Sequence, residues 1–518
     1  MIIYGEFPVT IENKKNKRMK FIYIKAATVI MIASAFISCN KLKEDPDSII
    51  VASQFYKTQA DAIAAVAAVY SSLNSDPAGD FPIYGRNLNL LIGNGSDDQV
   101  YSPSNTNPDV RALGTTTYVA SNDRVRKIWQ QHYYGISKAN LAIDNIPAIQ
   151  FDETLRSRLV REAKFIRALL YFNLVRLHGD VPLILHDPTT VDVNSLKVAR
   201  TKANDVYQQI IADLIDAGNL PATYTGADKG RATAGAAHAL LAKVYVTKKD
   251  WINAQVELEK VLTAGSFSNA TGEYGYDLFA NFKDAFQKPT KNGKEHIFSV
   301  QFETNLGAKN SQNFVSSGDF SSFNPAVYAG DLPDERLVAI FDSADTRRSV
   351  TFFNKLTNPA TNQVVDFGAV TRFAKFIDFT ISPLTNQAQS GLNIPVIRYA
   401  DVLLLYAETL NEINGGPTVD AYTAINKVRA RAYGDILHGL TVGLSQSEFR
   451  DAVFLERRKE FVQEANRWFD LVRSGTLVEA LKKIPAKATN VSEKNYLYPV
   501  PQVEIDLNPL LLPQNPGW

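Results

Sequence analysis

Apolar residues recur at spacings of three and four along much of the first half of the chain, a pattern that predicts helices with one buried face. The ranges with this spacing are 61–73, 124–146, 153–178, 203–214 and 232–248. Thr58 followed by Asp61 has the form of a capping box at the start of the first range. Breakers at Gly135 and at 179–182 predict interruptions. We therefore expect an antiparallel array of helices.

Two stretches show the pattern of tetratricopeptide repeats, which pair two helices in about 34 residues. Range 231–265 has a turn at 248–250 between two helical patterns, and range 399–432 has one at 415–417. In the first stretch the apolar residues at the repeat's relative spacings are Leu241, Ala242, Tyr245, Ala254 and Leu258. Plain helix hairpins would have the same pattern. Either interpretation makes these residues scaffold.

The amino-acid composition changes between residues 266 and 393, where Asn, Ser, Thr, Gly and Phe replace the periodic Ala and Leu. Short apolar runs at 297–302 and 371–379 predict strands. Loops on a rigid scaffold commonly carry function. The expected fold is therefore mainly α-helical, with helical regions 39–265 and 394–518 forming one fold and the irregular, partly β insert 266–393 forming a ligand lobe.

Residues 1–38 have the layout of a leader with a bacterial lipoprotein signal peptide. Lys20 and Lys25 precede an apolar stretch, 26–37, and Ser38 stands immediately before Cys39, the sole cysteine of the chain. Acyl chains such as palmitate on Cys39 would anchor the protein to a membrane, although an unmodified thiol is the alternative. Met19 is the expected start, with Met1 as the other possibility.

Charge and motif content exclude several classes of function. Lys plus Arg number 55 against 54 Asp plus Glu, a net charge of +1, which argues against a nucleic-acid partner. No apolar run after the signal reaches the roughly 18 residues of a membrane span. The six histidines form no His-x-x-x-His pair, and the sequence Gly-Asn-Gly at 93–95 lacks the rest of a phosphate-binding loop and is interpreted as a turn. We predict no metal and no cofactor.

Several separate motifs carry a family resemblance. In chain order they occupy 161–172 with 177–183, 230–233 with 239–245, 398–402 with 407–408, 456–461 with 467–471, and 498–501 with 515–518. These segments, among them Arg-Trp-Phe-Asp-Leu at 467–471 and the terminal Asn-Pro-Gly-Trp, resemble those of the SusD/RagB-like outer-membrane nutrient-binding lipoproteins. The resemblance covers nearly the whole chain after Cys39.

This resemblance implies a tetratricopeptide-like scaffold and a role in nutrient uptake. The protein would be lipid-anchored in the cell outer membrane and exposed on the surface, binding glycans and delivering them to a SusC-like TonB-dependent transporter. Lys43-Glu44-Asp45 resembles a surface-export signal, although an acidic linker would look the same. Peptide cargo and a protein-interaction scaffold are the alternatives. No enzyme is expected, because Glu456 and Glu460 sit beside Arg457 and Arg458 as in a salt-bridged helix.

Candidate ligand residues follow from the chemistry of sugar recognition, in which aromatic rings stack on sugars and polar side chains orient hydroxyls. The tryptophans at 129, 251, 468 and 518 fall in segments resembling the family scaffold, so we expect them in the core. Two regions remain, 80–107, which resembles the family's early ligand loop, and 314–328. Their candidate residues are Tyr84, Asn94, Asp97, Asp98 and Tyr101 in the first and Phe320, Phe323 and Tyr328 in the second.

Overall fold

The computed structural model describes residues 55–102, 105–187, 192, 194, 196–304, 331–357, 362, 364–380 and 390–518. The signal peptide, Cys39, the Lys43-Glu44-Asp45 motif and the three candidates at 320, 323 and 328 lie outside these ranges. Tyr56–Trp518 form one structural unit. Everything below concerns that unit.

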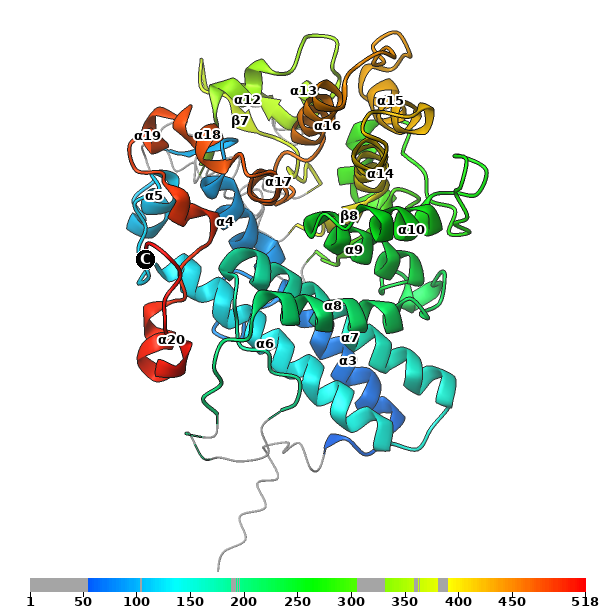
Figure 1. Ribbon diagram of the computed structural model, residues 1–518, viewed down its shortest axis with the longest axis vertical. Coiled ribbons are helices and arrows are strands. Elements are labelled where there is room, and N and C mark those ends of the chain that lie inside the picture. Colours follow the sequence, from blue (N-terminus) through cyan, green and yellow to red (C-terminus); the bar gives the residue numbers. More distant parts are fainter. Residues whose placement is uncertain are drawn as a thin grey trace, which may run out of the picture. The chain divides into compact units, whose positions relative to one another are not determined.

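Long antiparallel helices form the N-terminal part, as the periodicity predicts (Figure 1). They are α3 (Gln59–Asn74), α6 (Asp123–Asn145), α7 (Glu153–His178) and α8 (Ala203–Ala217). The capping box is present, with the Asp61 backbone N–H donating to Thr58 Oγ1 at 3.2 Å and the Thr58 N–H donating to Asp61 Oδ2 at 2.7 Å. Helix α6 packs on both α3 and α7. The prediction of a helical array is confirmed.

The predicted break at Gly135 is wrong, because α6 runs through this residue without interruption. A Cβ atom here would lie 2.6 Å from Leu170 Cδ1 and 2.7 Å from Ser72 Oγ. Both distances are shorter than van der Waals contact, so glycine is required for the close approach of α3, α6 and α7. Tertiary packing explains this glycine, and its low helix propensity is overridden.

Two helix hairpins continue the array at the positions expected for tetratricopeptide-like pairs. The first is α9 (Ala234–Thr247) with α10 (Trp251–Val261), and the second is α14 (Tyr399–Asn414) with α15 (Val419–Tyr433). Leu241, Ala242, Ala254 and Leu258 are buried, and Tyr245 is half-buried. Because α10 packs against α14, the two hairpins stack although 137 residues separate Val261 from Tyr399 in the sequence.

The strands form short antiparallel pairs. These are β1 (Gln99–Tyr101) with β3 (Asp331–Pro333), β2 (His296–Val300) with β8 (Ile394–Arg398), β4 (Phe352–Phe353) with β7 (Arg372–Phe373), and β5 (Lys355–Thr357) with β6 (Val364–Asp366). The run at 297–302 largely forms β2, as predicted, whereas only two residues of 371–379 form a strand, β7. Through β2 and β8 the irregular insert is paired directly with the C-terminal region.

Shorter helices complete the unit. In the N-terminal part they are η1 (Ile83–Asn87), α4 (Leu88–Gly95), α5 (Pro108–Gly114), η2 (Ile146–Ala148) and η3 (Gly226–Asp228). The insert contains η4 (Phe282–Phe286), η5 (Lys288–Thr290), α12 (Glu335–Ala339) and α13 (Arg347–Thr351). The C-terminal part contains α16 (Gln446–Glu460), α17 (Arg467–Ser474), α18 (Leu477–Lys482), α19 (Pro485–Ala488), η7 (Glu493–Tyr496), α20 (Gln502–Leu507) and η8 (Pro509–Leu511).

A buried network of ion pairs ties the insert to the C-terminal helices. Arg398 pairs with Glu295 at 2.5 Å, with Glu460 at 2.9 Å and with Glu464 at 2.7 Å, and each of these side chains is at most 3% exposed. Arg347 of α13 joins the network through Glu460 at 3.0 Å. Glu460 thus has the structural role expected from its place on a salt-bridged helix.

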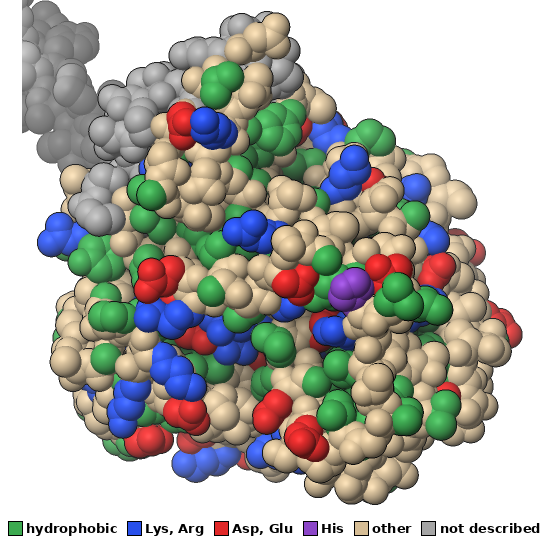
Figure 2. Space-filling model, turned by 90° about the horizontal axis from the view of Figure 1, so that it is seen from above, with side chains coloured by type: hydrophobic (Ala, Val, Ile, Leu, Met, Phe, Trp, Pro, Cys, Tyr) green, Lys and Arg blue, Asp and Glu red, His purple; other side chains and the backbone are tan. Residues whose placement is uncertain are grey.

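The surface mixes charges of both signs. On the face seen from above, Lys and Arg side chains alternate with Asp and Glu over the described residues (Figure 2), in agreement with a net charge of +1. Within the described ranges, no helix combines the length and apolar character needed to cross a membrane.

Candidate functional site

The region 80–107, expected to be a loop, contains two helical segments and a strand, and most of its described residues are buried. Its chain forms η1 and α4 before reaching β1, and the described residues from 82 to 99 are all buried. The predicted turn at 93–95 is wrong, since these residues end α4. Gly95 allows α4 to approach the C-terminal part, because a Cβ there would lie 2.3 Å from the hydroxyl oxygen of Tyr498.

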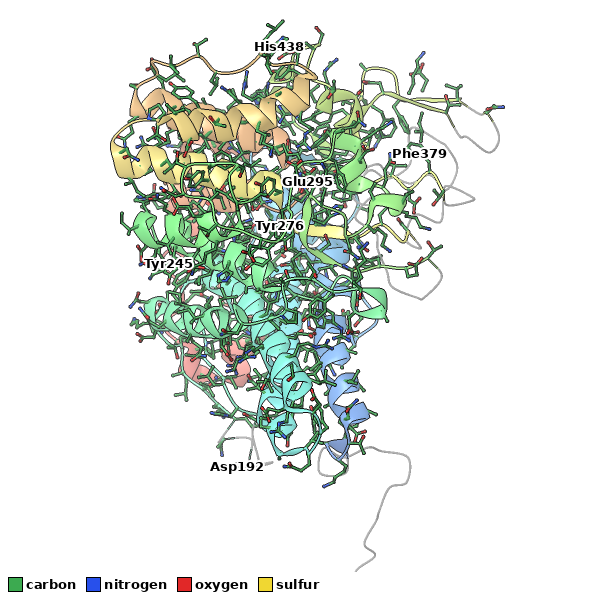
Figure 3. The ribbon with its side chains drawn as sticks, turned by 90° about the vertical axis from the view of Figure 1, so that its right-hand side faces the viewer. Asp192, Tyr245, Tyr276, Glu295, Phe379 and His438 are labelled. Carbon is green, nitrogen blue, oxygen red and sulfur yellow. The ribbon has the colours of Figure 1, made fainter. Side chains whose placement is uncertain are left out.

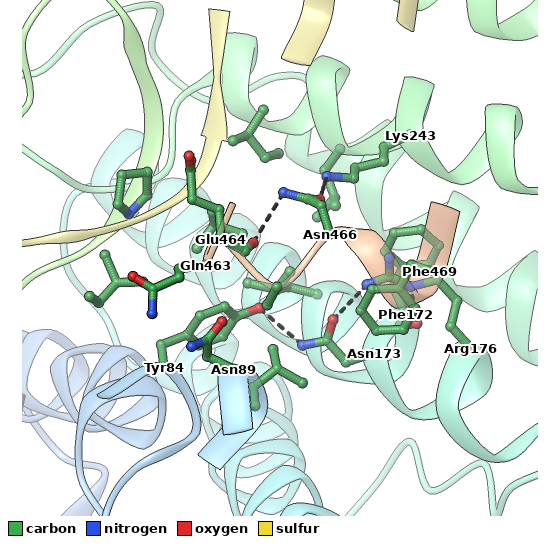
Figure 4. A pocket seen from close by; sticks show the side chains of 18 residues that line it. Tyr84, Asn89, Phe172, Asn173, Arg176, Lys243, Gln463, Glu464, Asn466 and Phe469 are labelled. Atoms are coloured by element: carbon green, nitrogen blue, oxygen red, sulfur yellow. Dashed lines mark hydrogen bonds between the residues drawn. The ribbon is translucent and has the colours of Figure 1, made fainter. Parts of the chain in front are cut away.

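Tyr84 lines a small internal cavity (Figure 4). Its ring is 7% exposed, and its hydroxyl oxygen accepts a hydrogen bond from Asn173 Nδ2 at 3.0 Å. Burial raises the pKa of Tyr84 to about 12. The cavity measures about 40 Å³, whereas pockets for drug-sized ligands measure roughly 300 Å³ or more. In this structure Tyr84 therefore faces space for a few water molecules and none for a sugar ring.

The same cavity holds an arginine between two aromatic rings. The Arg176 guanidinium lies 3.7 Å from the centroid of Phe172 and 3.6 Å from that of Phe469, and its Nη2 donates to Asn173 Oδ1 at 2.7 Å. Burial lowers the pKa of Arg176 to about 10. These contacts fasten α7 to α17. The cavity is thus part of the junction between the N-terminal and C-terminal parts.

Asp97 and Asp98 are held in ion pairs with the C-terminal helices. Arg467 donates from Nε to Asp97 Oδ1 at 2.8 Å and from Nη2 to Asp97 Oδ2 at 2.9 Å, and Arg458 Nε donates to Asp98 Oδ1 at 2.7 Å. Burial alone would raise the pKa of Asp97, but Arg467 and Arg458 lower it to about 2. For Asp98 burial prevails and raises the pKa. Both carboxylates hold the segment before β1 against α16 and α17. Their contact with a ligand stays a prediction.

Asn94 is fully buried and is hydrogen-bonded to Asp331 of the β1–β3 strand pair. Its Nδ2 donates to Asp331 Oδ1 at 2.8 Å and to the Leu90 carbonyl at 3.0 Å. Burial raises the pKa of Asp331 to about 7, against the lowering effect of the Asn94 hydrogen bond. Like the carboxylates of Asp97 and Asp98, the side-chain nitrogen of Asn94 is engaged in contacts within the fold. Contact of Asn94 with a ligand stays a prediction.

A buried lysine, absent from the sequence-based candidates, fixes the segment between α4 and β1. Lys487 is fully buried, and its Nζ donates to the backbone carbonyls of Asn94 at 2.6 Å, Ser96 at 2.5 Å and Gln99 at 2.9 Å. Burial lowers its pKa to about 8. No sequence motif signals this role, because the three acceptors lie about 390 residues away in the chain and are backbone atoms.

Tyr101 is the candidate that the fold leaves half-buried at the end of β1. It pairs with Asp331 in β3, the first described residue after the range 305–330 that contains Phe320, Phe323 and Tyr328. The strand pair thus joins the early candidate region to a residue that lies three positions after the end of the second one in the sequence. The tryptophans follow the expectation in part, since Trp129 and Trp468 are at most 3% exposed, while Trp251 and Trp518 are partly buried.

Within the described part of the chain, no group of three His, Cys, Asp or Glu side chains is arranged to hold a metal ion. The carboxylate-rich places are ion-paired: Glu456 Oε1 lies 2.7 Å from Arg347 Nη1, and Glu456 Oε2 lies 2.8 Å from Arg429 Nη1. What the geometry offers instead is a rigid, internally neutralised scaffold beneath Tyr101.

Comparison with known proteins identifies this architecture. Residues 369–518 match the family model described as the SusD family, and residues 82–246 match the model described as starch-binding associating with outer membrane. The chain belongs to the SusD family. The matched ranges include both the α7 motif and the Arg-Trp-Phe-Asp-Leu motif from which the resemblance was inferred.

Relatives of this SusD-family chain align along almost its full length. SusD-like protein P2 of Formosa agariphila is 29% identical over 95% of this chain and 99% of the relative. A laminarin-binding SusD-like protein of known structure is 26% identical with a TM-score of 0.74, covering 89% of this chain and 100% of that chain. A SusD homolog from Bacteroides thetaiotaomicron is 25% identical with a TM-score of 0.76, over 90% and 98%. The mainly helical SusD-like fold is therefore confirmed.

Proposed function

We propose that this protein is a surface lipoprotein that binds nutrient glycans and delivers them to a SusC-like TonB-dependent outer-membrane transporter. The observation that carries the proposal is membership of the SusD family together with the likeness to a laminarin-binding member over 89% of the chain. The description of the second family model, starch-binding associating with outer membrane, supports both the cargo and the location.

The geometry supports a binding role without catalysis. Tyr101 is a half-buried aromatic ring on a strand fixed by Lys487 and by the β1–β3 pair, which suits a rigid stacking platform for a sugar ring. A glycosidase needs two carboxyl groups about 5 to 10 Å apart and free to act on the bond between sugars. Asp97 and Asp98 are engaged with Arg467 and Arg458. We therefore assign no enzymatic activity.

Membrane attachment in this proposal rests on Cys39. Two or more acyl chains there would hold the folded unit at the outer membrane, since each buried methylene contributes about 0.8 kcal/mol. Changing Cys39 to Ser should release the protein from the membrane fraction into the soluble fraction while leaving glycan binding intact. Membrane retention of the Cys39→Ser variant would contradict the lipid anchor.

The test of the cargo is calorimetric titration of residues 40–518 with soluble oligosaccharides and with oligopeptides at millimolar concentration. We expect heat with oligosaccharides, and its loss in the Tyr101→Ala and Phe320→Ala variants. Tyr245→Ala, which alters a half-buried aromatic residue of the α9–α10 hairpin (Figure 3), is the matched control and should bind normally.

The other outcomes separate the alternatives. Heat with oligopeptides alone would establish peptide cargo and contradict the glycan assignment. Binding of neither ligand, with co-purification of a non-transport protein, would favour an interaction scaffold. Delivery is tested independently by co-purification from outer membranes, where a SusC-like transporter is expected with the wild-type protein.

A further inference from the structure

A second, larger pocket lies beside the α9–α10 hairpin, away from the predicted ligand regions. Four chain segments line this pocket, which we call the tyrosine pocket. They are the stretch 222–233 before α9, residues 274–276, the turn 292–294 and strand β2. Its volume is about 210 Å³, five times that of the Tyr84 cavity. None of the five predicted ligand-binding residues that the structure describes lines it.

Aromatic rings form part of its wall. Tyr276 is buried with its hydroxyl 3.1 Å from Thr233 Oγ1, and its ring lies 5.6 Å from that of Tyr274, centroid to centroid. Tyr274 is half-buried, as is Tyr224, whose hydroxyl donates to Glu162 Oε1 at 3.4 Å. Figure 3 labels Tyr276, seen from the side of α9 and α10. The pocket therefore offers fixed ring surfaces that are partly open to solvent.

Gly230, a lining residue, lies close to the side chain of Gln301. Its φ of +100° suits glycine, and a Cβ there would lie 2.7 Å from the Gln301 side chain. Gln301 is itself locked in place by paired amide hydrogen bonds with Asn292 at 2.7 and 3.0 Å. Asn292 lines the pocket, so this part of the wall is rigid before any ligand arrives.

Two buried polar atoms of lining residues have no hydrogen-bond partner among the described residues. They are Oγ of Ser299, a residue that is 3% exposed, and Nδ1 of His296, which is half-buried. His296 Nε2 lies 2.9 Å from the Ala285 carbonyl oxygen, so Nε2 carries the proton and Nδ1 is left as an acceptor. A buried polar atom left unpaired costs about 1–3 kcal/mol. Sugar hydroxyls both donate and accept, so they have the chemistry to pair with an imidazole acceptor and with a serine hydroxyl.

The charged residues that line the pocket are all basic. They are Lys229, Arg231 and Lys294, and no Asp or Glu is among the described lining residues. Arg231 is neutralised by Glu162 at 2.8 Å and Lys294 by Asp277 at 3.1 Å. Lys229 is exposed, and no carboxylate in the described part of the chain pairs with it. The pocket therefore presents one uncompensated ammonium group at its rim.

We propose that the tyrosine pocket binds one hexuronic acid residue of a glycan, a pyranose ring that carries a carboxylate. The ring stacks on Tyr274 and Tyr224, its hydroxyls pair with Ser299 Oγ and His296 Nδ1, and its carboxylate meets Lys229. This inference rests on the proposed function, from which it takes a glycan as the cargo. The residues it assigns are different from the ligand candidates Tyr101 and Phe320. It gives the protein a second sugar site with a preference for acidic glycans.

Titration of the mature chain with an oligogalacturonide and with the matching neutral oligogalactoside tests the proposal. Tyr274→Ala and Ser299→Ala should each weaken binding of the acidic sugar about tenfold, a change of 1.4 kcal/mol. Lys229→Met should weaken it several-fold, remove its salt dependence and leave neutral-sugar binding unchanged. Lys483→Met, at an exposed lysine that follows α18 and does not line the pocket, is the control and should bind like wild type.

Ser299→Ala keeps the test decisive, because it removes a hydroxyl that makes no hydrogen bond and should leave stability unchanged or higher. Equal affinity of wild type and of the Tyr274→Ala and Ser299→Ala variants for the oligogalacturonide would overturn the proposal. So would equal loss of neutral and acidic sugar binding in Lys229→Met. Glycan binding that depends on Tyr101 alone would refute this pocket and leave the proposed function standing, whereas absence of any glycan binding would refute both.

Discussion

Asp331 shows how a single buried carboxyl couples this fold to pH. Its side chain is 1% exposed, and burial raises its pKa to about 7 while Asn94 supplies one hydrogen bond. In the unfolded chain the same group titrates near 3.8. Between these two values the folded state holds a proton that the unfolded state has lost, so stability falls as pH rises through this window. The full effect amounts to about 4 kcal/mol, at 1.36 kcal/mol per pKa unit.

Changing Asp331 to Asn should therefore raise the free energy of unfolding at pH 8 by up to about 4 kcal/mol and have little effect at pH 4. Urea unfolding at the two pH values measures the difference. Asp506→Asn, at an exposed aspartate of α20, is the control and should show no such pH dependence. An equal effect of Asp331→Asn at both pH values would contradict the assignment.

Lys487 is the residue on which the geometry beneath Tyr101 depends most. Lys487→Met would leave three buried carbonyls, those of Asn94, Ser96 and Gln99, without their donor. We expect a loss of at least about 3 kcal/mol in unfolding free energy, with faster amide hydrogen exchange in β1. Lys483→Met, four residues earlier on the exposed surface, should change neither quantity. Protection of β1 that survives in Lys487→Met would show that another contact holds this segment.

At the scale of secondary structure, local sequence signals determine where a helix begins and ends, and glycine determines how closely neighbouring helices pack. Helix α7 begins and ends at the residues that its apolar pattern predicts, because the Asp152 side chain caps its first turn and Gly179 ends it with a φ of +72°. Gly135, in contrast, lies inside α6 and affects the packing of the neighbouring helices α3 and α7. It lets α3, α6 and α7 approach more closely than any Cβ atom would permit.

Gly135→Ala should destabilise the protein by about 1–3 kcal/mol through overpacking, although alanine has the better helix propensity. Thermal or urea unfolding measures this loss. Gly416→Ala is the control, since a Cβ at Gly416 would meet no atom within 4 Å, and its effect should stay within about 0.5 kcal/mol. A stabilised Gly135→Ala variant would show that the three helices readily separate.

Over the whole molecule, the insert and the C-terminal helices are joined by charges that water does not reach. Arg398 touches three carboxylates from different parts of the chain, those of Glu295, Glu460 and Glu464. Removal of one member of such a buried network leaves its partners as uncompensated charges, which is far more costly than the loss of an exposed pair. The network therefore makes the insert and the helical scaffold unfold together.

Arg398→Met should lower the free energy of unfolding by about 3–5 kcal/mol. Arg450→Met is the matched control, because Arg450 is 38% exposed and pairs with Glu412 alone among the described carboxylates, and its loss should cost less than about 1 kcal/mol. The wild-type protein and the Arg450→Met control, in which the network is intact, should unfold in one transition. Separate unfolding of the insert in the wild-type protein would contradict this coupling.

The sequence by itself determined the long helices, the capping box at Thr58, the hairpin pairs and the family, because periodicity and capping are local signals that α-helices express without help from distant residues. It singled out Tyr101 as a ligand candidate in an expected loop, whereas the structure places this residue at the end of β1; its contact with ligand stays a prediction. Glu456 and Glu460 were expected to be structural, and their arginine partners agree.

Only the tertiary structure decided which polar residues are free to bind. Tyr84, Asn94, Asp97 and Asp98 looked like loop residues, yet the fold buries all four. The Arg467–Asp97 contact spans 370 residues, so no local pattern announces it. The tyrosine pocket depends in the same way on four separated segments. Burial and partner choice arise from long-range packing, which a linear pattern of apolar and polar residues does not encode.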